Sequence, residues 1–321
     1  MADRLRLTEK GGQFLREWLS GDSFIMARTS GSTGKPKEIR LPKSDMRASA
    51  RATNRFFGIG RDSFLLCPLS ADYIAGKMMI VRALEAGCGL LMTEPSNHLG
   101  NTINKIAAEY GLIDLLPLVP SQCESSIAET DCRAIRNIIV GGAPVSPETE
   151  KQLTGLPCSV WATYGMTETC SHVAVRPMGS PLYEAMPGIS FSADEDGKLA
   201  IIAPEYSFST LPTNDVVELA DSRHFRWLGR ADNVVNSGGI KIFPEQLERE
   251  LAPLIPFPFY FKGEPDAKWG TRLVLVAQCR RHEAERLARL CRHHLPPYSV
   301  PKDIRCVEKI PATANGKIRR V

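Results

Sequence analysis

The segment RNIIVGG, residues 136–142, has the pattern of a short buried strand that ends at a pair of glycines. Comparable apolar runs, followed by glycine or by a helical pattern, occur in FLLCPLS (64–70) and CSVWATYG (158–165). This alternation is typical of an α/β fold with largely parallel strands, whose ligands bind beyond the carboxyl ends of the strands. The loops after these strands are therefore where we expect the chemistry.

Further elements extend the pattern in both directions. FIMAR (24–28) predicts a strand, and Ser44 with Asp45 is expected to cap an amphipathic helix that ends near Phe57. From Val216 onward, VVELADSRHFRWLG predicts a β-hairpin. After Asn233 the sequence predicts a helix at 244–251, a strand at 272–279 and a helix at 283–295.

The 321 residues are enough for two domains with separate cores. Residues 233–321 contain 16 Lys/Arg against 9 Asp/Glu, a net charge of +7, whereas the preceding residues carry −3. Because the pattern and the charge both change near Asp232, we expect a large N-terminal α/β domain (1–231) and a small α+β C-terminal domain (232–321). The basic domain suits a polyanionic ligand, although a solvated surface without a partner explains the charge equally well.

Composition excludes several classes of protein. With 43% hydrophobic and 24% charged residues the chain is globular, and no apolar run approaches the ~20 residues of a membrane span. The start, MADRLRLTEK, lacks the apolar region of a signal peptide, and the 9 cysteines form no C-x-x-C pair. We therefore expect a cytoplasmic protein with reduced thiols, no membrane span and no nucleic-acid partner.

The loop TSGSTGKPK (29–37) is suited to a polyphosphate, because glycines let backbone N–H groups turn inward while hydroxyls and lysines add donors and charge. It is not a P-loop. That motif would need Gly at position 29 and Ser or Thr at position 36, where this chain has Thr and Pro. A kinase or P-loop ATPase is disfavoured accordingly.

Four motifs follow the loop in order: YGMTE (164–168), PTND (212–215), GRADNVVNSGGIKIFPEQLE (229–248) and LPPYSVPKDIRCVEKIPATANGKIRR (295–320). Together with the loop they resemble the signatures of the adenylate-forming superfamily, from about Phe24 to the C-terminus. The resemblance implies a two-step ligase. A carboxylate attacks the α-phosphate of ATP to give an acyl-AMP and pyrophosphate, and then a thiol, expected to be coenzyme A, displaces AMP.

The resemblance also implies roles in the first step. The β- and γ-phosphates would be held by Ser30, Gly31, Ser32, Thr33, Gly34 and Lys37. Thr167 would hydrogen-bond the α-phosphate, and Glu168 would offer an oxygen to Mg²⁺. Tyr164 would give adenine an aromatic face, and Gly141, Gly142 and Ala143 would bring backbone close to the base and the acyl group.

Three further residues complete the first step in this resemblance. Asp215 and Arg230 would hold the ribose, and Lys317 would bridge the substrate carboxylate and the α-phosphate. Where the family usually has glycine before the aspartate, this chain has Asn214. Asparagine tolerates left-handed backbone angles, so we expect the turn to survive.

The second step requires a rotation of the C-terminal domain in this superfamily. The mobile domain would turn about Asp232, where backbone torsions absorb the swing. Ser237, Gly238 and Gly239 would then line the tunnel for the pantetheine arm of coenzyme A, since only glycine allows so close an approach of the backbone.

Within the superfamily, SADYIAGKMMIVRALEAG (70–87) and NSGGIKIFPEQLE (236–248) resemble the short-form o-succinylbenzoate–CoA ligases of menaquinone biosynthesis. Tyr73 stands where many relatives have a gate residue. A dianionic acid needs a cationic anchor, for which Lys77, His172 and Arg176 are the candidates. A purely structural role for each of the three stays an alternative.

About 28 residues precede the phosphate loop, where family members usually have well over a hundred. We therefore expect an N-terminal domain shortened relative to the family, either in a compact enzyme or in a chain whose surface a partner chain completes. A homo-oligomer is a separate expectation. The alternatives to an o-succinylbenzoate–CoA ligase are another aryl- or acyl-CoA ligase and a non-catalytic adenylate-binding module. Joint retention of the catalytic-type residues favours an enzyme; these are Glu168, Asp215, Arg230 and Lys317.

Overall fold

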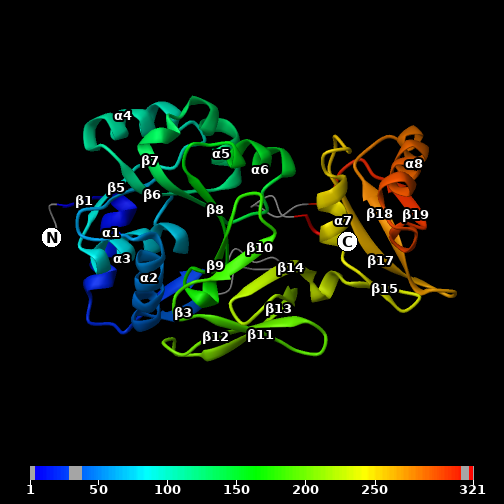
Figure 1. Cartoon of the computed structure of the whole chain (residues 1–321), viewed down its shortest axis with the longest axis horizontal. Coiled ribbons are helices and arrows are strands. Elements are labelled where there is room, and N and C mark those ends of the chain that lie inside the picture. The colour runs from blue at the N-terminus through cyan, green and yellow to red at the C-terminus, as the bar shows by residue number, and fades with distance from the viewer. Residues whose placement is uncertain (1–3, 29–37, 312–317, 321) are drawn as a thin grey trace.

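The computed structural model describes residues 4–28, 38–311 and 318–320. A twelve-stranded sheet has the order β1-β5-β4-β6-β7-β8-β9-β10-β14-β13-β12-β11. Separate sheets are formed by β17-β18-β19, by β15-β16 and by β2-β3. In Figure 1 the large sheet and helices α1 to α6 make up one body, and the three-stranded sheet with α7 and α8 lies beside it.

The first half of the large sheet is parallel and covered by helices on both faces. Leu65 and Leu66, neighbours in β4, belong to two different apolar cores, because successive side chains of a strand point to opposite faces. One core includes side chains of α2 and α3, and the other includes side chains of α4 and α5. The parallel strands are β1 (Leu5–Arg6), β5 (Gly89–Met92), β4 (Phe64–Cys67), β6 (Ile113–Leu118), β7 (Ile135–Val140) and β8 (Ser159–Gly165). The helices are α1 (Glu9–Leu19), α2 (Lys43–Phe57), α3 (Ile74–Ala86), α4 (Gly100–Tyr110), α5 (Pro120–Ser126) and α6 (Pro147–Thr154), with short 3₁₀ turns η2 (Ile127–Glu129) and η3 (Cys132–Ala134).

The second half of the large sheet is antiparallel, so the prediction of largely parallel strands holds only as far as β8. The reason is local: β8 and β9 are joined by residues 166–171, which include the 3₁₀ turn η4 (Thr167–Thr169) and are too few for a helical crossover. The predicted hairpin from Val216 is confirmed and begins earlier than expected. These strands are β9 (His172–Pro177), β10 (Leu182–Ala185), β11 (Ser190–Ala193), β12 (Lys198–Ala203), β13 (Ser209–Leu219) and β14 (His224–Arg230).

The N-terminal strand and helix are found near their expected positions, but the expected helix cap is wrong. β2 (Phe24–Arg28) pairs with β3 (Glu38–Pro42), and α2 begins at Lys43 without a side-chain cap. Asp45 is buried instead, and its carboxylate accepts hydrogen bonds from the Ser207 N–H at 3.0 Å and the Ser207 hydroxyl at 2.6 Å. The aspartate therefore joins α2 to the antiparallel half of the sheet.

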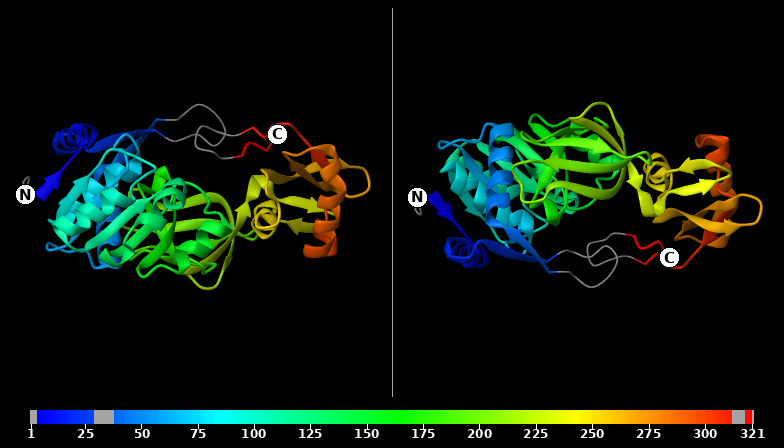
Figure 2. Two further views of the ribbon diagram at one scale, coloured as in Figure 1. Left: turned by 90° about the horizontal axis from the view of Figure 1, so that it is seen from above. Right: turned by 90° about the horizontal axis from the view of Figure 1, so that it is seen from below.

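The elements after Arg230 form their own sheets and their own apolar core. Figure 2 shows them from two sides, beside the end of the large sheet. They are η5 (Ala231–Asn233), β15 (Val235–Ser237), β16 (Ile240–Ile242), α7 (Pro244–Leu251), β17 (Phe259–Asp266), β18 (Gly270–Ala277), η6 (Arg281–Glu283), α8 (Ala284–His294), η7 (Pro297–Ser299) and β19 (Asp303–Cys306). This arrangement matches the expected class of a large α/β part with a small α+β part. The domain boundary at residue 232 stays a prediction. None of the helices in the described part of the chain has the length and apolarity that crossing a bilayer would require.

Candidate active site

Asp215 is the centre of a buried polar cluster. One carboxylate oxygen, Oδ2, accepts the Tyr164 hydroxyl at 2.7 Å, and Oδ1 accepts the Trp227 indole N–H at 3.1 Å. Burial, followed by the charge and hydrogen bond of Asp215, raises the pKa of Tyr164, so the phenol stays protonated and donates. The carboxylate is thus held in a fixed position. Trp227 was not anticipated, although its place opposite Val217 in the hairpin puts it close to the aspartate.

Arg230 lies opposite Asp215 in the hairpin, with its guanidinium 3.6 Å from Asp215 Oδ1 and 3.6 Å from Asp232 Oδ2. Asn214 does not adopt the left-handed angles that we expected. Among the described non-glycine residues only Cys170 and Ser209 have positive φ. The Asn214 amide instead donates to the Asp232 carboxylate at 3.0 Å and 3.1 Å. The predicted sugar site and the predicted hinge are therefore adjacent.

The turn between β8 and β9 carries Thr167, which is partly buried, and Glu168, which is exposed. The shape of the turn is fixed by Thr169, which is fully buried. The Thr169 hydroxyl accepts a hydrogen bond from the Met166 N–H at 3.0 Å. Cys170 closes the turn with a φ of 63°, a conformation that costs about 1–3 kcal/mol and is found most often at functional sites. Within the described residues no cluster of three or more His, Cys, Asp or Glu could hold a metal. Glu168 alone suits Mg²⁺, which binds through one or two carboxylates together with phosphates and water.

The carboxyl end of β7 lies beside this turn because β7 and β8 pair in parallel. A Cβ on Gly141 would lie 2.3 Å from the hydroxyl of Thr163, so a larger residue there would displace that side chain and break its hydrogen bond to the Val140 carbonyl. Gly142 has a φ of +88°, and Ala143 follows as a partly buried residue. These three residues can bring backbone close to a ligand, as expected. The predicted phosphate-binding residues and the predicted bridging lysine lie outside the described residues: Ser30, Gly31, Ser32, Thr33, Gly34, Lys37 and Lys317.

Arg82, in α3, is a second residue that the sequence did not indicate. Only 2% of it is exposed, one guanidinium nitrogen donates to the Ser171 hydroxyl at 2.5 Å, and Nε has no partner. No carboxylate of the described residues pairs with it. Burial lowers the pKa of Arg82 to about 10, so the group remains charged at neutral pH. A buried cation without an anion is costly, and it marks a place where an anionic ligand would be stabilised.

His172 lies next to this arginine but cannot serve as a cationic anchor. Its Nε2 is 3.2 Å from the Thr53 hydroxyl, and its Nδ1 is 3.4 Å from the Ser171 hydroxyl. Burial, followed by the positive charge of Arg82, holds the pKa of His172 well below its usual value. The ring is therefore neutral at pH 7, and the expectation that it supplies a positive charge is corrected.

The other candidates for the anchor already have partners. The Lys77 ammonium donates to the Met26 carbonyl at 3.3 Å and lies 3.8 Å from a Glu17 oxygen. Arg176 is buried and donates to Glu150 Oε1 at 2.6 Å. Tyr73 precedes α3 and is 64% exposed. Of the cations considered, Arg82 is the one whose charge no acidic side chain in the described part of the chain offsets.

Replacing Arg176 with methionine is expected to destabilise the fold. The change removes the shortest ion pair of the buried Glu150 carboxylate. Arg249 still pairs with Glu150 at 2.7 Å, so the carboxylate is not left uncompensated, and we expect the loss of one charge-assisted hydrogen bond, about 1.5–3 kcal/mol. Urea unfolding followed by circular dichroism measures the difference. A loss below about 1 kcal/mol would mean that Arg176 is not structural and would return it to the list of ligand-binding candidates.

The glycine pair predicted to approach coenzyme A forms the turn between β15 and β16. Gly238 and Gly239 have φ of +59° and +84°, and Ser237 before them is buried. A Cβ on Gly238 would lie 3.0 Å from the ring of Trp269, and the Gly238 N–H donates to the Trp269 carbonyl at 3.0 Å. Both glycines are therefore required by the backbone, which agrees with a close approach but does not identify what approaches.

Comparison with protein families gives the class to which this fold and site belong. Residues 15–194 match the model of the AMP-binding enzyme, and residues 261–317 match the model of the AMP-binding enzyme C-terminal domain. The fold is that of an adenylate-forming enzyme, as the sequence predicted. The chain belongs to the AMP-binding enzyme family.

Several named proteins are similar to this chain. An acyl-CoA synthetase (AMP-forming)/AMP-acid ligase II-like protein from Dyadobacter fermentans is 35% identical, with 96% of this chain and 91% of that chain covered and a TM-score of 0.65. The 2-succinylbenzoate–CoA ligase of Listeria monocytogenes is 27% identical, with 97% of this chain and 72% of the relative covered. o-Succinylbenzoate CoA synthetase from Bacillus subtilis, solved with the acyl-adenylate intermediate OSB-AMP, shares the fold with a TM-score of 0.78 at 21% identity, covering 91% of this chain and 67% of that one. The predicted class of AMP-forming ligase is confirmed.

Proposed function

We propose that this chain is an ATP- and Mg²⁺-dependent acid–CoA ligase that acts through an acyl-adenylate, with 2-succinylbenzoate (o-succinylbenzoate) as its acid. The observation that carries the choice of acid is the buried Arg82 guanidinium, which no carboxylate of the described residues offsets. 2-Succinylbenzoate has two carboxylates. One must remain free to attack ATP, so the other needs an anchor away from the phosphates.

Arg82 is suitably placed for that second carboxylate. Its partner Ser171 lies at the end of the turn that carries Thr167 and Glu168, and the Ser171 carbonyl lies 2.4 Å from where a Cβ on Gly165 would be. In this proposal the reacting carboxylate lies at Thr167 and the distal end of the acid extends toward Ser171 and Arg82, which are joined by a hydrogen bond. A guanidinium in so dry a site attracts an anion more strongly than it would at the surface. The relatives named 2-succinylbenzoate–CoA ligase support the same acid.

The nucleotide would occupy the opposite side of the turn. Asp215, already fixed by Tyr164 and Trp227, would accept the ribose hydroxyls, and Arg230 would donate to the same sugar. Thr167 would hydrogen-bond the α-phosphate, and Glu168 would hold Mg²⁺ with the phosphates. In this proposal the loop from Ser30 to Lys37 binds the β- and γ-phosphates. A relative from Bacillus subtilis has been solved with ATP and a magnesium ion, which supports this choice of ligands.

Coenzyme A as the thiol, rotation about Asp232 and pantetheine at the Ser237–Gly239 turn belong to the same proposal. The net charge of +7 on residues 233–321 supports a ligand with several phosphates. A cytoplasmic location and a homo-oligomeric state stay predictions from the sequence.

The test is a panel of acids. Pyrophosphate release would be followed with ATP, Mg²⁺ and, in turn, 2-succinylbenzoate, benzoate, and short- and medium-chain fatty acids. We expect kcat/KM for 2-succinylbenzoate to exceed that for benzoate by at least about 10²-fold, since a desolvated ion pair with the second carboxylate is lost with benzoate. Turnover confined to another acid would assign a different acyl-CoA ligase, and ATP binding without release on any acid would assign a binding module.

A further inference from the structure

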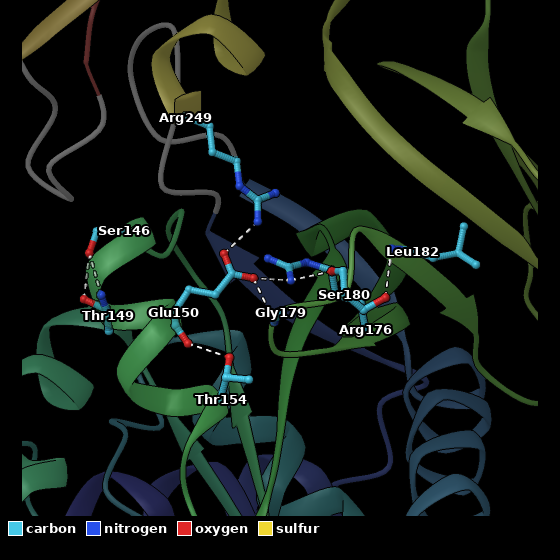
Figure 3. A network of polar contacts seen from close by, with 9 residues as sticks. All are labelled: Ser146, Thr149, Glu150, Thr154, Arg176, Gly179, Ser180, Leu182 and Arg249. Atoms are coloured by element: carbon cyan, nitrogen blue, oxygen red, sulfur yellow. Dashed lines mark hydrogen bonds and ion pairs between the residues drawn. The ribbon is translucent and has the colours of Figure 1, made fainter. Parts of the chain in front are cut away.

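The carboxylate of Glu150, in α6, bonds to two arginines, one from each part of the chain (Figure 3). Only 6% of the residue is exposed. Its Oε1 accepts from Arg176 at 2.6 Å and from the Gly179 N–H at 3.0 Å, both within the large-sheet body. Its Oε2 accepts from Arg249 of α7 at 2.7 Å. One carboxylate oxygen thus bonds to residues of the large body, and the other bonds to a residue of the smaller body.

The carboxylate does not need Arg249 in order to be neutralised. Arg176, buried to the same degree, already gives it one full ion pair, so the second arginine leaves the group of three with a net positive charge. Burial alone would raise the pKa of Glu150, but the hydrogen bond and charge of Arg176, the Gly179 N–H and the charge of Arg249 hold it below its usual value. Glu150 therefore offers a fixed negative charge whether or not α7 is in contact.

Among the described residues, and apart from the contacts of Asp232 at the junction itself, two ion pairs join the bodies, and Arg249 makes the stronger of them. The other, from Lys241 to Asp196 at 2.9 Å, joins side chains that are 51% and 66% exposed, and such pairs contribute little. The Arg249 side chain is 53% exposed, but its partner oxygen is on a side chain only 8% exposed. A charge-assisted bond to so rigid an acceptor is more favourable and more directional than one between two mobile surface groups.

We propose that Arg249 is a positioning residue: by binding Glu150 it holds the C-terminal part against α6, in the orientation of this structure, and must release Glu150 whenever that part rotates. The inference rests on the proposed rotation about Asp232. Helix α6 carries none of the residues assigned to substrate. Through Glu150 it would nevertheless help to determine how long the C-terminal part stays in each orientation. The Glu150 and Arg176 pair would remain behind as a preformed acceptor for the return of α7.

The test is a distance distribution between the two bodies. Spin labels would be attached through non-natural amino acids at Lys151 and Arg289, both exposed, in the full chain without ligands. In Arg249→Met we expect the ratio of docked to undocked molecules to fall about fivefold to tenfold, the effect of one ordinary hydrogen bond, because solvent weakens the charge of the half-exposed Arg249. Arg249→Lys keeps the charge but loses the planar guanidinium. Its ratio of docked to undocked molecules should lie between those of the unmodified chain and Arg249→Met. Glu250→Gln, an exposed change on the same helix, should match the unmodified chain.

An unchanged distribution in Arg249→Met would overturn the proposal, as would an equal shift in Glu250→Gln. Because Arg176 still pairs with Glu150, Arg249→Met should unfold in urea at the same concentration as the unmodified chain, which separates docking from stability. In the enzyme, single-turnover rates of acyl-adenylate formation and of thioester formation should change unequally, by about fivefold relative to each other. Equal changes in both rates would contradict a positioning role. The distance arm needs no substrate, so its outcome is independent of which acid the enzyme uses.

Discussion

Lys317→Ala is expected to slow acyl-adenylate formation by about 10²–10³-fold and to leave thioester formation from supplied acyl-adenylate nearly unchanged. The attacking carboxylate and the α-phosphate are both anions, and a cation between them offsets their repulsion only while the bond between them forms. The second step has no such requirement, because the attacking group is a thiol and AMP leaves. ATP–pyrophosphate exchange measures the first rate, and release of AMP from added acyl-adenylate and coenzyme A measures the second.

Lys309→Ala is the matched control, since it removes a lysine from the same C-terminal segment eight residues earlier. It should leave both rates within about twofold. Equal losses in the two half-reactions of Lys317→Ala would contradict the role proposed for this lysine and would indicate damage to the segment as a whole.

Arg82→Met should raise KM for 2-succinylbenzoate by about 10²-fold while changing KM for ATP little, because the lost ion pair is dry and lies on the acid side of the turn. The same change should not weaken the fold. Replacing a buried, uncompensated charge with an apolar side chain of similar length removes a desolvation cost, so unfolding by urea should be unaffected or shifted to higher concentration. A loss of acid binding without a loss of stability would separate ligand recognition from packing.

Arg51→Met is the comparison for this variant. Arg51 pairs with Glu85 at 2.7 Å near α3 but is 59% exposed, so its removal should alter neither KM. If Arg82→Met and the unmodified enzyme discriminate equally between 2-succinylbenzoate and benzoate, the second carboxylate is bound elsewhere.

Most of the helices and strands could be predicted from the local pattern of apolar residues and glycines. The main error was the direction of the strands after β8, which depends on a short connection. Strands such as Ile135–Val140 and Ser159–Gly165 are marked by apolar runs that end in glycine. The reversal after β8 depends on six residues whose path is fixed by Thr169 and Cys170, and nothing in their composition distinguishes a turn from the start of a crossover. The cap expected at Asp45 was wrong for a related reason, since the partner that it binds, Ser207, is distant in sequence.

The candidate site, like the fold, could be predicted only in part. Motif residues such as Tyr164, Asp215 and Arg230 were placed together by the resemblance, and their contacts agree with that grouping. The proposed cationic anchor, Arg82, could not be singled out from the sequence, because the sequence does not show which cations are buried or which have an acidic partner. Arg176 and Arg82 are both arginines near apolar runs, and only the packing shows that Glu150 compensates the first and that nothing described compensates the second.

The residues proposed for the acid and those proposed for the sugar come from different stretches of the chain. Arg82 and the side chains near it belong to α2, α3 and residues 171–172, whereas Asp215 is held by side chains of β8 and β14. In the proposed arrangement, substitutions in α3 would alter the choice of acid without changing any residue assigned to ATP.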